Sequence, residues 1–109
     1  MSRKRYFAWD YSACWNGNVE EVEQLLNSNP KIINDKHSSG WTPLCMACKE
    51  GHTEVVKLLL NHEKIDVNKI MSRGETPFYA ACKSGKTEVV KLLLGDKRVN
   101  VNVQTQSSW

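Results

Sequence analysis

Long apolar segments are missing from this sequence of 109 residues. No apolar run approaches the ~20 residues needed to cross a bilayer, and no apolar signal-peptide core follows the basic segment Met1–Arg5. We therefore expect no membrane partner and no secretion by the usual route. Charge of one sign is also scarce, because the formal net charge is only +3. The one basic cluster, Arg3, Lys4 and Arg5, is too small to predict a nucleic-acid partner.

Residues arranged for catalysis or metal binding are scarce too. His37, His52 and His62 fall in a predicted turn, at a helix start and at a helix end, and there is no glycine-rich phosphate loop. Cys45 and Cys48 form a Cys-x-x-Cys with His52 one helical turn further on. A zinc site would need four converging ligands, and a redox pair would need a strand that leads into a helix. The sequence offers neither context, so we expect no enzyme activity, no cofactor and no metal.

What the sequence does contain is an internal repeat with a 34-residue period. The segment 53–60, Thr-Glu-Val-Val-Lys-Leu-Leu-Leu, recurs without change at 87–94. The skeleton of residues 40–51 also recurs, at 74–85. An earlier, degenerate copy keeps the same register through Ala13, Cys14 and Gly17. A fixed period of this length predicts stacked units, none of which can bury its apolar face alone.

Each unit predicts two helices and a loop. Thr42 can accept hydrogen bonds from free N–H groups at a helix start, and Pro43 suits the first helical position. With Gly51 as the stop signal, we expect a helix over 43–50. A second helix follows at once and is apolar on more than one face, as suits a helix between neighbouring units. The polar stretch over 61–74 predicts an extended loop and turn.

This unit, with Thr-Pro-Leu at 42–44 opening its first helix, resembles the ankyrin repeat, and the resemblance covers residues 5–103. The tetratricopeptide repeat has the same period but needs an aromatic and Gly-Tyr pattern that is absent here. The resemblance implies an all-α solenoid of stacked helix-turn-helix repeats with connecting β-turn loops. We expect a single domain over 1–109, with a capping repeat at 6–39, further repeats at 40–73 and 74–107, and the start of a fourth at the C-terminus.

Three cysteines, Cys14, Cys48 and Cys82, occupy the same repeat position, which the ankyrin family usually fills with alanine. We interpret them as buried core thiols. Equivalent positions in helices stacked about 8–10 Å apart exceed the ~7 Å between Cα atoms that a disulfide allows. The thiols are therefore predicted to be free, which favours an intracellular, cytoplasmic location.

The resemblance also implies where a partner would bind. Ankyrin partners usually dock on the concave face, made by the turn tips and the outward positions of each first helix. Trp15, Trp41 and Met46 fall at such positions with no evident internal role, and both residue types are enriched at interface cores. The alternative is that Trp41 folds over its neighbouring helix and Trp15 seals the amino-terminal unit. The candidate binding residues are Trp15, Asn16, Trp41, Met46, Lys49, Glu50, Arg73, Glu75 and Lys83.

These observations predict a non-catalytic protein-interaction module, whose partner the sequence does not name. One alternative is a regulatory fragment of a longer protein whose activity lies elsewhere. Another is a scaffold that self-associates through an uncapped C-terminal repeat, where second-helix residues such as Phe78 and Val90 would otherwise pack against a neighbour.

Overall fold

The computed structural model of this chain describes residues 12–36, 40–71 and 73–101. Within these ranges there is no strand, and no helix is long and apolar enough to cross a membrane. The prediction of an all-α fold is confirmed. The helical elements are, in chain order, α1 (Ser12–Asn16), α2 (Val19–Ser28), the 3-10 helix η2 (Pro30–Asn34), α3 (Pro43–Glu50), α4 (Thr53–Leu60), α5 (Pro77–Lys83) and α6 (Thr87–Leu94).

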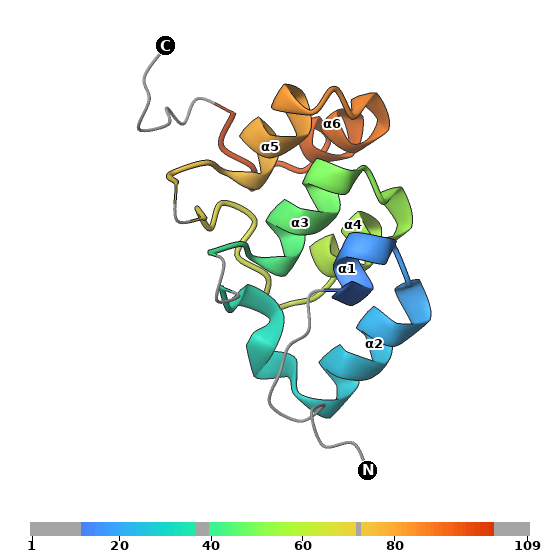
Figure 1. Cartoon of the computed structure of the whole chain (residues 1–109). Coiled ribbons are helices and arrows are strands. Elements are labelled where there is room, and N and C mark those ends of the chain that lie inside the picture. The colour runs from blue at the N-terminus through green and yellow to red at the C-terminus, as the bar shows by residue number, and fades with distance from the viewer. Residues whose placement is uncertain (1–11, 37–39, 72, 102–109) are drawn as a thin grey trace.

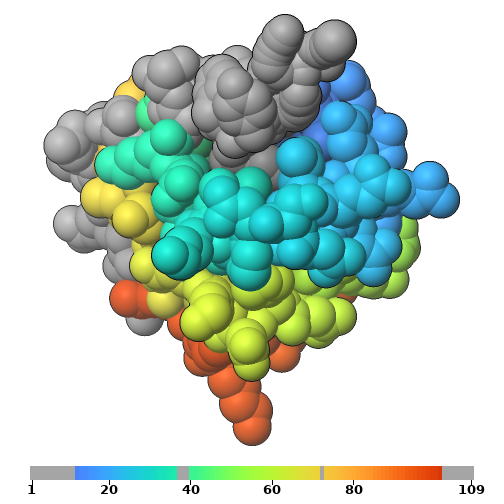
Figure 2. All heavy atoms as spheres, turned by 90° about the horizontal axis from the view of Figure 1, so that it is seen from below, coloured from blue at the N-terminus to red at the C-terminus, as the bar shows by residue number. Residues whose placement is uncertain are grey.

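The α-helices form two layers that run along a stack (Figure 1). Helices α1, α3 and α5 pack in one layer, and α2, α4 and α6 pack in the other. We call α1 with α2, α3 with α4, and α5 with α6 the first, second and third helix pairs. In Figure 2, which shows the stack from below, blue and cyan, yellow-green and red-orange parts of the chain follow one another in sequence order. The second pair therefore has a helix pair on both sides.

Local signals set the start and end of the first helix in a pair. The Oγ1 atom of Thr42 accepts a hydrogen bond from the backbone N–H of Cys45 at 3.1 Å, and Thr76 accepts the same bond from Tyr79 at 3.1 Å. A proline follows each threonine at the first helical position. Gly51 ends α3 with a φ of 76°, a left-handed conformation that glycine adopts at no steric cost. The helix predicted over 43–50 is confirmed.

Small side chains let the helices of the stack approach closely. The buried residues of the first-helix layer include Ala13, Cys14, Ala47, Cys48 and Ala81. Helix α4 buries Val55, Val56 and Leu59 completely, because helices of the pairs on both sides pack against it. This burial explains why its sequence is apolar on more than one face, as predicted for a helix between neighbours.

Asparagines at one repeat position join the loops of successive pairs. Asn34 donates from Nδ2 to the carbonyl oxygen of Lys64 at 2.8 Å, and its Oδ1 accepts from the N–H of Asp66 at 2.7 Å. Asn68 makes the same two bonds to the loop after α6, at 2.9 and 2.8 Å. The loops are therefore fixed by polar contacts as well as by the buried side chain of Val67.

The outer surface of the third pair is uncovered in the part of the chain that the structure describes. Cys14 and Cys48 are fully buried, whereas Cys82, at the equivalent position, is exposed. Leu26 is 5% exposed, whereas Leu94, at the equivalent position two units later, is 58% exposed. The prediction that Cys82 is buried is wrong, because a cysteine at this position is covered only when another helix pair follows.

One of the two residues expected on the second helix at this end lies elsewhere. Phe78 lies on α5, the first helix of its pair, and not on the second helix. Val90 lies on α6, as expected. Both side chains are half-buried and pack against the core. The open end therefore exposes only part of each side chain.

Candidate protein-binding surface

Two tryptophans and a lysine from neighbouring pairs meet on the first-helix side of the stack. The Nζ atom of Lys49, in the last turn of α3, lies 6.0 Å from the ring centroid of Trp15 in α1. It also lies 5.8 Å from the ring of Trp41, which comes just before α3. Both distances are within the range of cation–π attraction. Lys49 pairs with Glu50 at 3.3 Å as well, so its ammonium group has a defined position between the two indoles.

At one repeat position the second pair has an indole beside a lysine, and the third pair has a carboxylate there. Lys83 occupies the repeat position of Lys49, and Glu75 occupies that of Trp41. The Nζ atom of Lys83 lies 3.2 Å from Oε2 of Glu75 and 6.0 Å from the ring centroid of Tyr79. A cation is therefore held at this position in both pairs, by two indoles and Glu50 in the second pair and by Tyr79 and Glu75 in the third.

A cleft of about 210 Å³ lies between these two cations. Five of the predicted binding residues line it, from α3, α5 and the segments that lead into these helices. Its lining residues are Trp41, Lys49, Arg73, Glu75, Ala80, Lys83 and Ser84. The structure thus brings together residues far apart in the sequence.

The remaining predicted residues are placed less uniformly. Trp15 is 45% exposed and Asn16 is exposed, both on α1, and Glu50 is half-buried. Met46 is only 1% exposed and belongs to the core, so the expectation that it is available to a partner is wrong. Helix α3 packs between α1 and α5, and this packing buries every residue from Pro43 to Cys48. Periodicity alone did not reveal so wide a buried face.

Trp41 partly follows the alternative interpretation, in which it folds over a helix. Its side chain is half-buried and packs against the core, while its ring also lines the cleft. The indole is therefore held by the fold on one side and is available to a ligand on the other. An amphipathic ring of this kind is suited to an interface.

His52, considered above as a metal ligand, links the first two pairs. Its Nε2 atom lies 2.6 Å from the carbonyl oxygen of Trp15. Its ring lies against Gly17, where a Cβ atom would come within 2.5 Å of Nδ1. The Sγ atom of Cys45 donates to the carbonyl oxygen of Lys69 at 3.8 Å. No group of three or more metal-binding side chains occurs in 12–36, 40–71 or 73–101.

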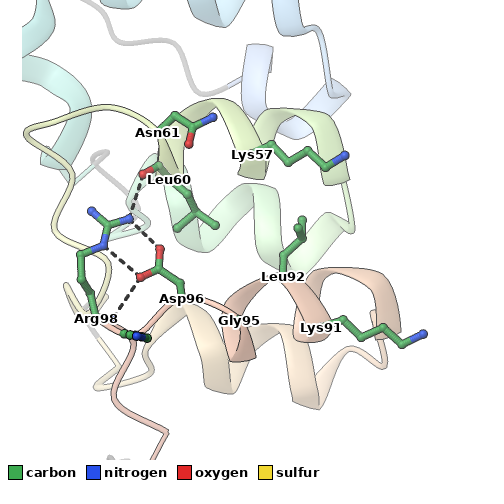
Figure 3. A pocket seen from close by; sticks show the side chains of 9 residues that line it. Lys57, Leu60, Asn61, Lys91, Leu92, Gly95, Asp96 and Arg98 are labelled. Atoms are coloured by element: carbon green, nitrogen blue, oxygen red, sulfur yellow. Dashed lines mark hydrogen bonds and ion pairs between the residues drawn. The ribbon is translucent and has the colours of Figure 1, made fainter.

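A second groove, of about 710 Å³, lies between α4 and α6 and contains none of the predicted residues (Figure 3). Arg98 lines it and donates from Nη2 to the carbonyl oxygen of Leu60 at 2.8 Å and to Oδ2 of Asp96 at 2.6 Å. The hydrogen bonds from Arg98 lower the pKa of Asp96. Because Leu60 ends α4, Arg98 satisfies a carbonyl that the helix leaves free. We therefore interpret this arrangement as structural.

Burial controls the acidity of the four thiols. Removal from water raises the pKa of Cys14 to about 12 and that of Cys45 to about 11. The pKa of Cys48 is raised well above its usual value, again chiefly by burial. Burial also raises the pKa of Cys82, but its side chain is exposed. Because the thiolate is the reactive form, the three buried cysteines should be inert and Cys82 should react.

A thiol reagent is therefore expected to modify one cysteine quickly and three slowly. We expect modification of Cys82 to be at least ~100-fold faster than that of the others, because Cys82 is the exposed thiol. Mass spectrometry of the timed reaction measures this directly. The Cys82→Ser variant is the control, and a rapid reaction that persists in it would contradict the placement of the other three.

The comparisons with known proteins agree with this architecture. The family model described as ankyrin repeats, in three copies, matches residues 11–105. Ankyrin repeats are generally protein–protein interaction modules and are typically non-catalytic. A search of curated proteins gives no match. The family match covers most of the chain, and the two-layered stack of short helices is the fold that it implies. This chain belongs to the ankyrin repeat family.

Proposed function

We propose that this chain is a non-catalytic module that binds a partner protein on its concave face. This face is formed by α1, α3, α5 and the turns that precede α3 and α5. The observation that carries the proposal is the placement of Trp15, which is 45% exposed and whose ring lies 6.0 Å from the Nζ atom of Lys49, a lining residue of the cleft. Burial of such a ring in a complex removes a large apolar area from water, and tryptophan is enriched among residues that dominate binding energy.

Replacement of Trp15 by alanine is expected to weaken binding of the captured partner by at least ~2 kcal/mol, or about 30-fold. The partner would be isolated with the intact chain as bait, and its affinity for each purified variant measured by calorimetry. Leu94→Ala is the matched control, because Leu94 is an exposed large apolar side chain on α6, in the other layer. Unchanged affinity in Trp15→Ala with an intact helical circular-dichroism spectrum would refute the proposed face.

A second candidate function is self-association through the third pair. The exposed side chain of Leu94 and the exposed thiol of Cys82 favour it, since both occupy positions that are covered in the first pair. Sedimentation equilibrium over a range of protein concentrations tests this candidate. A single monomeric mass over that range would exclude it, and a mass that rises with concentration and falls in Leu94→Glu would support it.

Three further proposals follow from the same residues. Free buried cysteines support an intracellular, cytoplasmic location, where thiols stay reduced. The repeat register supports a single domain with repeats at 6–39, 40–73 and 74–107. The third proposal is an alternative in which the chain is the binding region of a longer protein whose activity lies elsewhere. The identity of the captured partner would then indicate what that longer protein acts on.

A further inference from the structure

The cleft between α3 and α5 carries more positive than negative charge. Lys49, Arg73 and Lys83 line it, and Glu75 is the only acidic lining residue among those that the structure describes. The side chain of Glu75 is 12% exposed and pairs with Lys83, so its charge is already engaged. Lys49 is paired with Glu50. Arg73 is exposed and forms no ion pair with any carboxylate of the described residues.

Arg73 therefore differs from the two lysines in having its charge available. A guanidinium group presents a planar fork of N–H donors that matches a carboxylate, and it stays charged at every physiological pH. The rest of the lining consists of Trp41, Ala80 and Ser84. An incoming group would thus meet both an available cation and apolar surface within the same cleft.

The size of the cleft limits what can enter it. Ligand pockets for small molecules and cofactors usually occupy ~300–1,000 Å³. A volume of about 210 Å³ suits a single side chain better than a whole cofactor. Glu75 occupies the repeat position of Trp41 one unit later. Its carboxylate pairs with Lys83 in this same cleft. Carboxylates are therefore compatible with this surface.

We propose that the cleft accepts an acidic side chain of the bound protein, with its carboxylate on Arg73 and its methylene groups against Trp41. The inference rests on the proposed concave-face function and adds the chemistry of the partner: an acidic residue flanked by apolar ones. Arg73 selects the carboxylate, and Trp41 with Ala80 selects the apolar part of the segment. The positive potential of the cleft also favours approach of an acidic segment.

The test uses two short peptides, acetyl-Leu-Glu-Glu-Leu-amide and its glutamine counterpart, acetyl-Leu-Gln-Gln-Leu-amide. Each is titrated into the isotopically labelled full chain, and the resonances of the Arg73 Nε–H and the Trp41 indole N–H are followed. We expect the glutamate peptide to shift both resonances along saturable curves. The glutamine peptide should bind at least tenfold more weakly, because it offers no charge to Arg73.

Two variants with the same change of charge distinguish a specific carboxylate site from general electrostatic attraction to the chain. Arg73→Glu should weaken binding of the glutamate peptide at least tenfold, and Lys97→Glu, in the groove between α4 and α6, should change it less than twofold. Equal effects of the two variants, or no binding by the unmodified chain, would overturn the inference. A phosphoserine peptide that binds more than tenfold tighter than the glutamate peptide would also overturn it, in favour of a phosphate site.

The outcome for the captured partner distinguishes this inference from the proposed function. If the partner loses affinity for Trp15→Ala but not for Arg73→Glu, the proposed concave-face function stands and the inferred carboxylate site is refuted. Because Arg73 is exposed, Arg73→Glu is expected to leave the helical circular-dichroism spectrum unchanged. Arg73→Lys provides a second variant, and it should bind the glutamate peptide with intermediate affinity, because it keeps the charge without the fork.

Discussion

Replacement of Leu59 by alanine is expected to lower the free energy of unfolding by about 3 kcal/mol. Leu59 is fully buried in α4, which packs between α2 and α6. The shorter side chain would leave a cavity that neighbours on both sides cannot fill without moving. Three repeats are about the minimum for an independently stable stack, so the loss is large relative to the total stability. Urea denaturation followed by circular dichroism measures it.

The control for Leu59→Ala is Leu94→Ala, in the second copy of the same segment. Leu94 is 58% exposed, so its truncation should cost less than ~0.5 kcal/mol. A large loss in both variants would mean that another part of the chain or another molecule covers Leu94. A small loss in both would contradict the burial of α4 at the centre of the stack.

Amide hydrogen exchange is expected to be at least ~10-fold slower in residues 53–60 than in 87–94. The two segments have the same sequence, so helix propensity and intrinsic exchange rates cannot explain a difference. They differ in their neighbours, because α4 packs against both α2 and α6, whereas α6 packs against α4 at the end of the described stack. In a stack each interface adds to stability, so the third pair should open first.

Native-state exchange followed by NMR gives the rate for each amide. Equal protection of the two segments in a monomer would show that the open end of the third pair is already capped by some other contact. Equal protection that disappears on dilution would instead show that a second copy covers this end.

Most of the fold could be predicted because its signals are local and repeated. Thr42 and Pro43 mark a helix start, Gly51 marks its end, and the fixed repeat period implies stacking. The 3-10 helix η2 was not predicted, although Pro30 suits its first position and Ile33 anchors it in the core. The hydrogen bonds of Asn34 were also missed, although the asparagine recurs with the period.

Burial was predicted less well, because it depends on which neighbours a repeat position has. Cys82 was assigned the environment of Cys48 from the repeat register, but that environment requires a following helix pair. Met46 was assigned to the surface from its position in the ankyrin repeat, but α3 is covered from both sides. The repeat register therefore predicts helix boundaries in each unit. It predicts the burial of a side chain only in units that have a neighbour on both sides.

The candidate site was predicted in part for the same reason. The sequence could assign Trp15, Trp41 and Lys49 to one face, because each holds a defined position in its repeat. It could not show that the lysine lies between the two rings, since that depends on the spacing of neighbouring pairs. The availability of Arg73 also depends on which carboxylates the fold brings near it.

The most direct test of the concave face is the exchange footprint of the bound partner. Hydrogen exchange of the chain is measured by mass spectrometry with and without the captured partner at saturation. We predict slower exchange on binding in α1, α3 and α5 and around Trp41 and Arg73, with α4 little changed. Slower exchange confined to α4 and α6, with no change around Trp15 and Trp41, would contradict binding on the concave face.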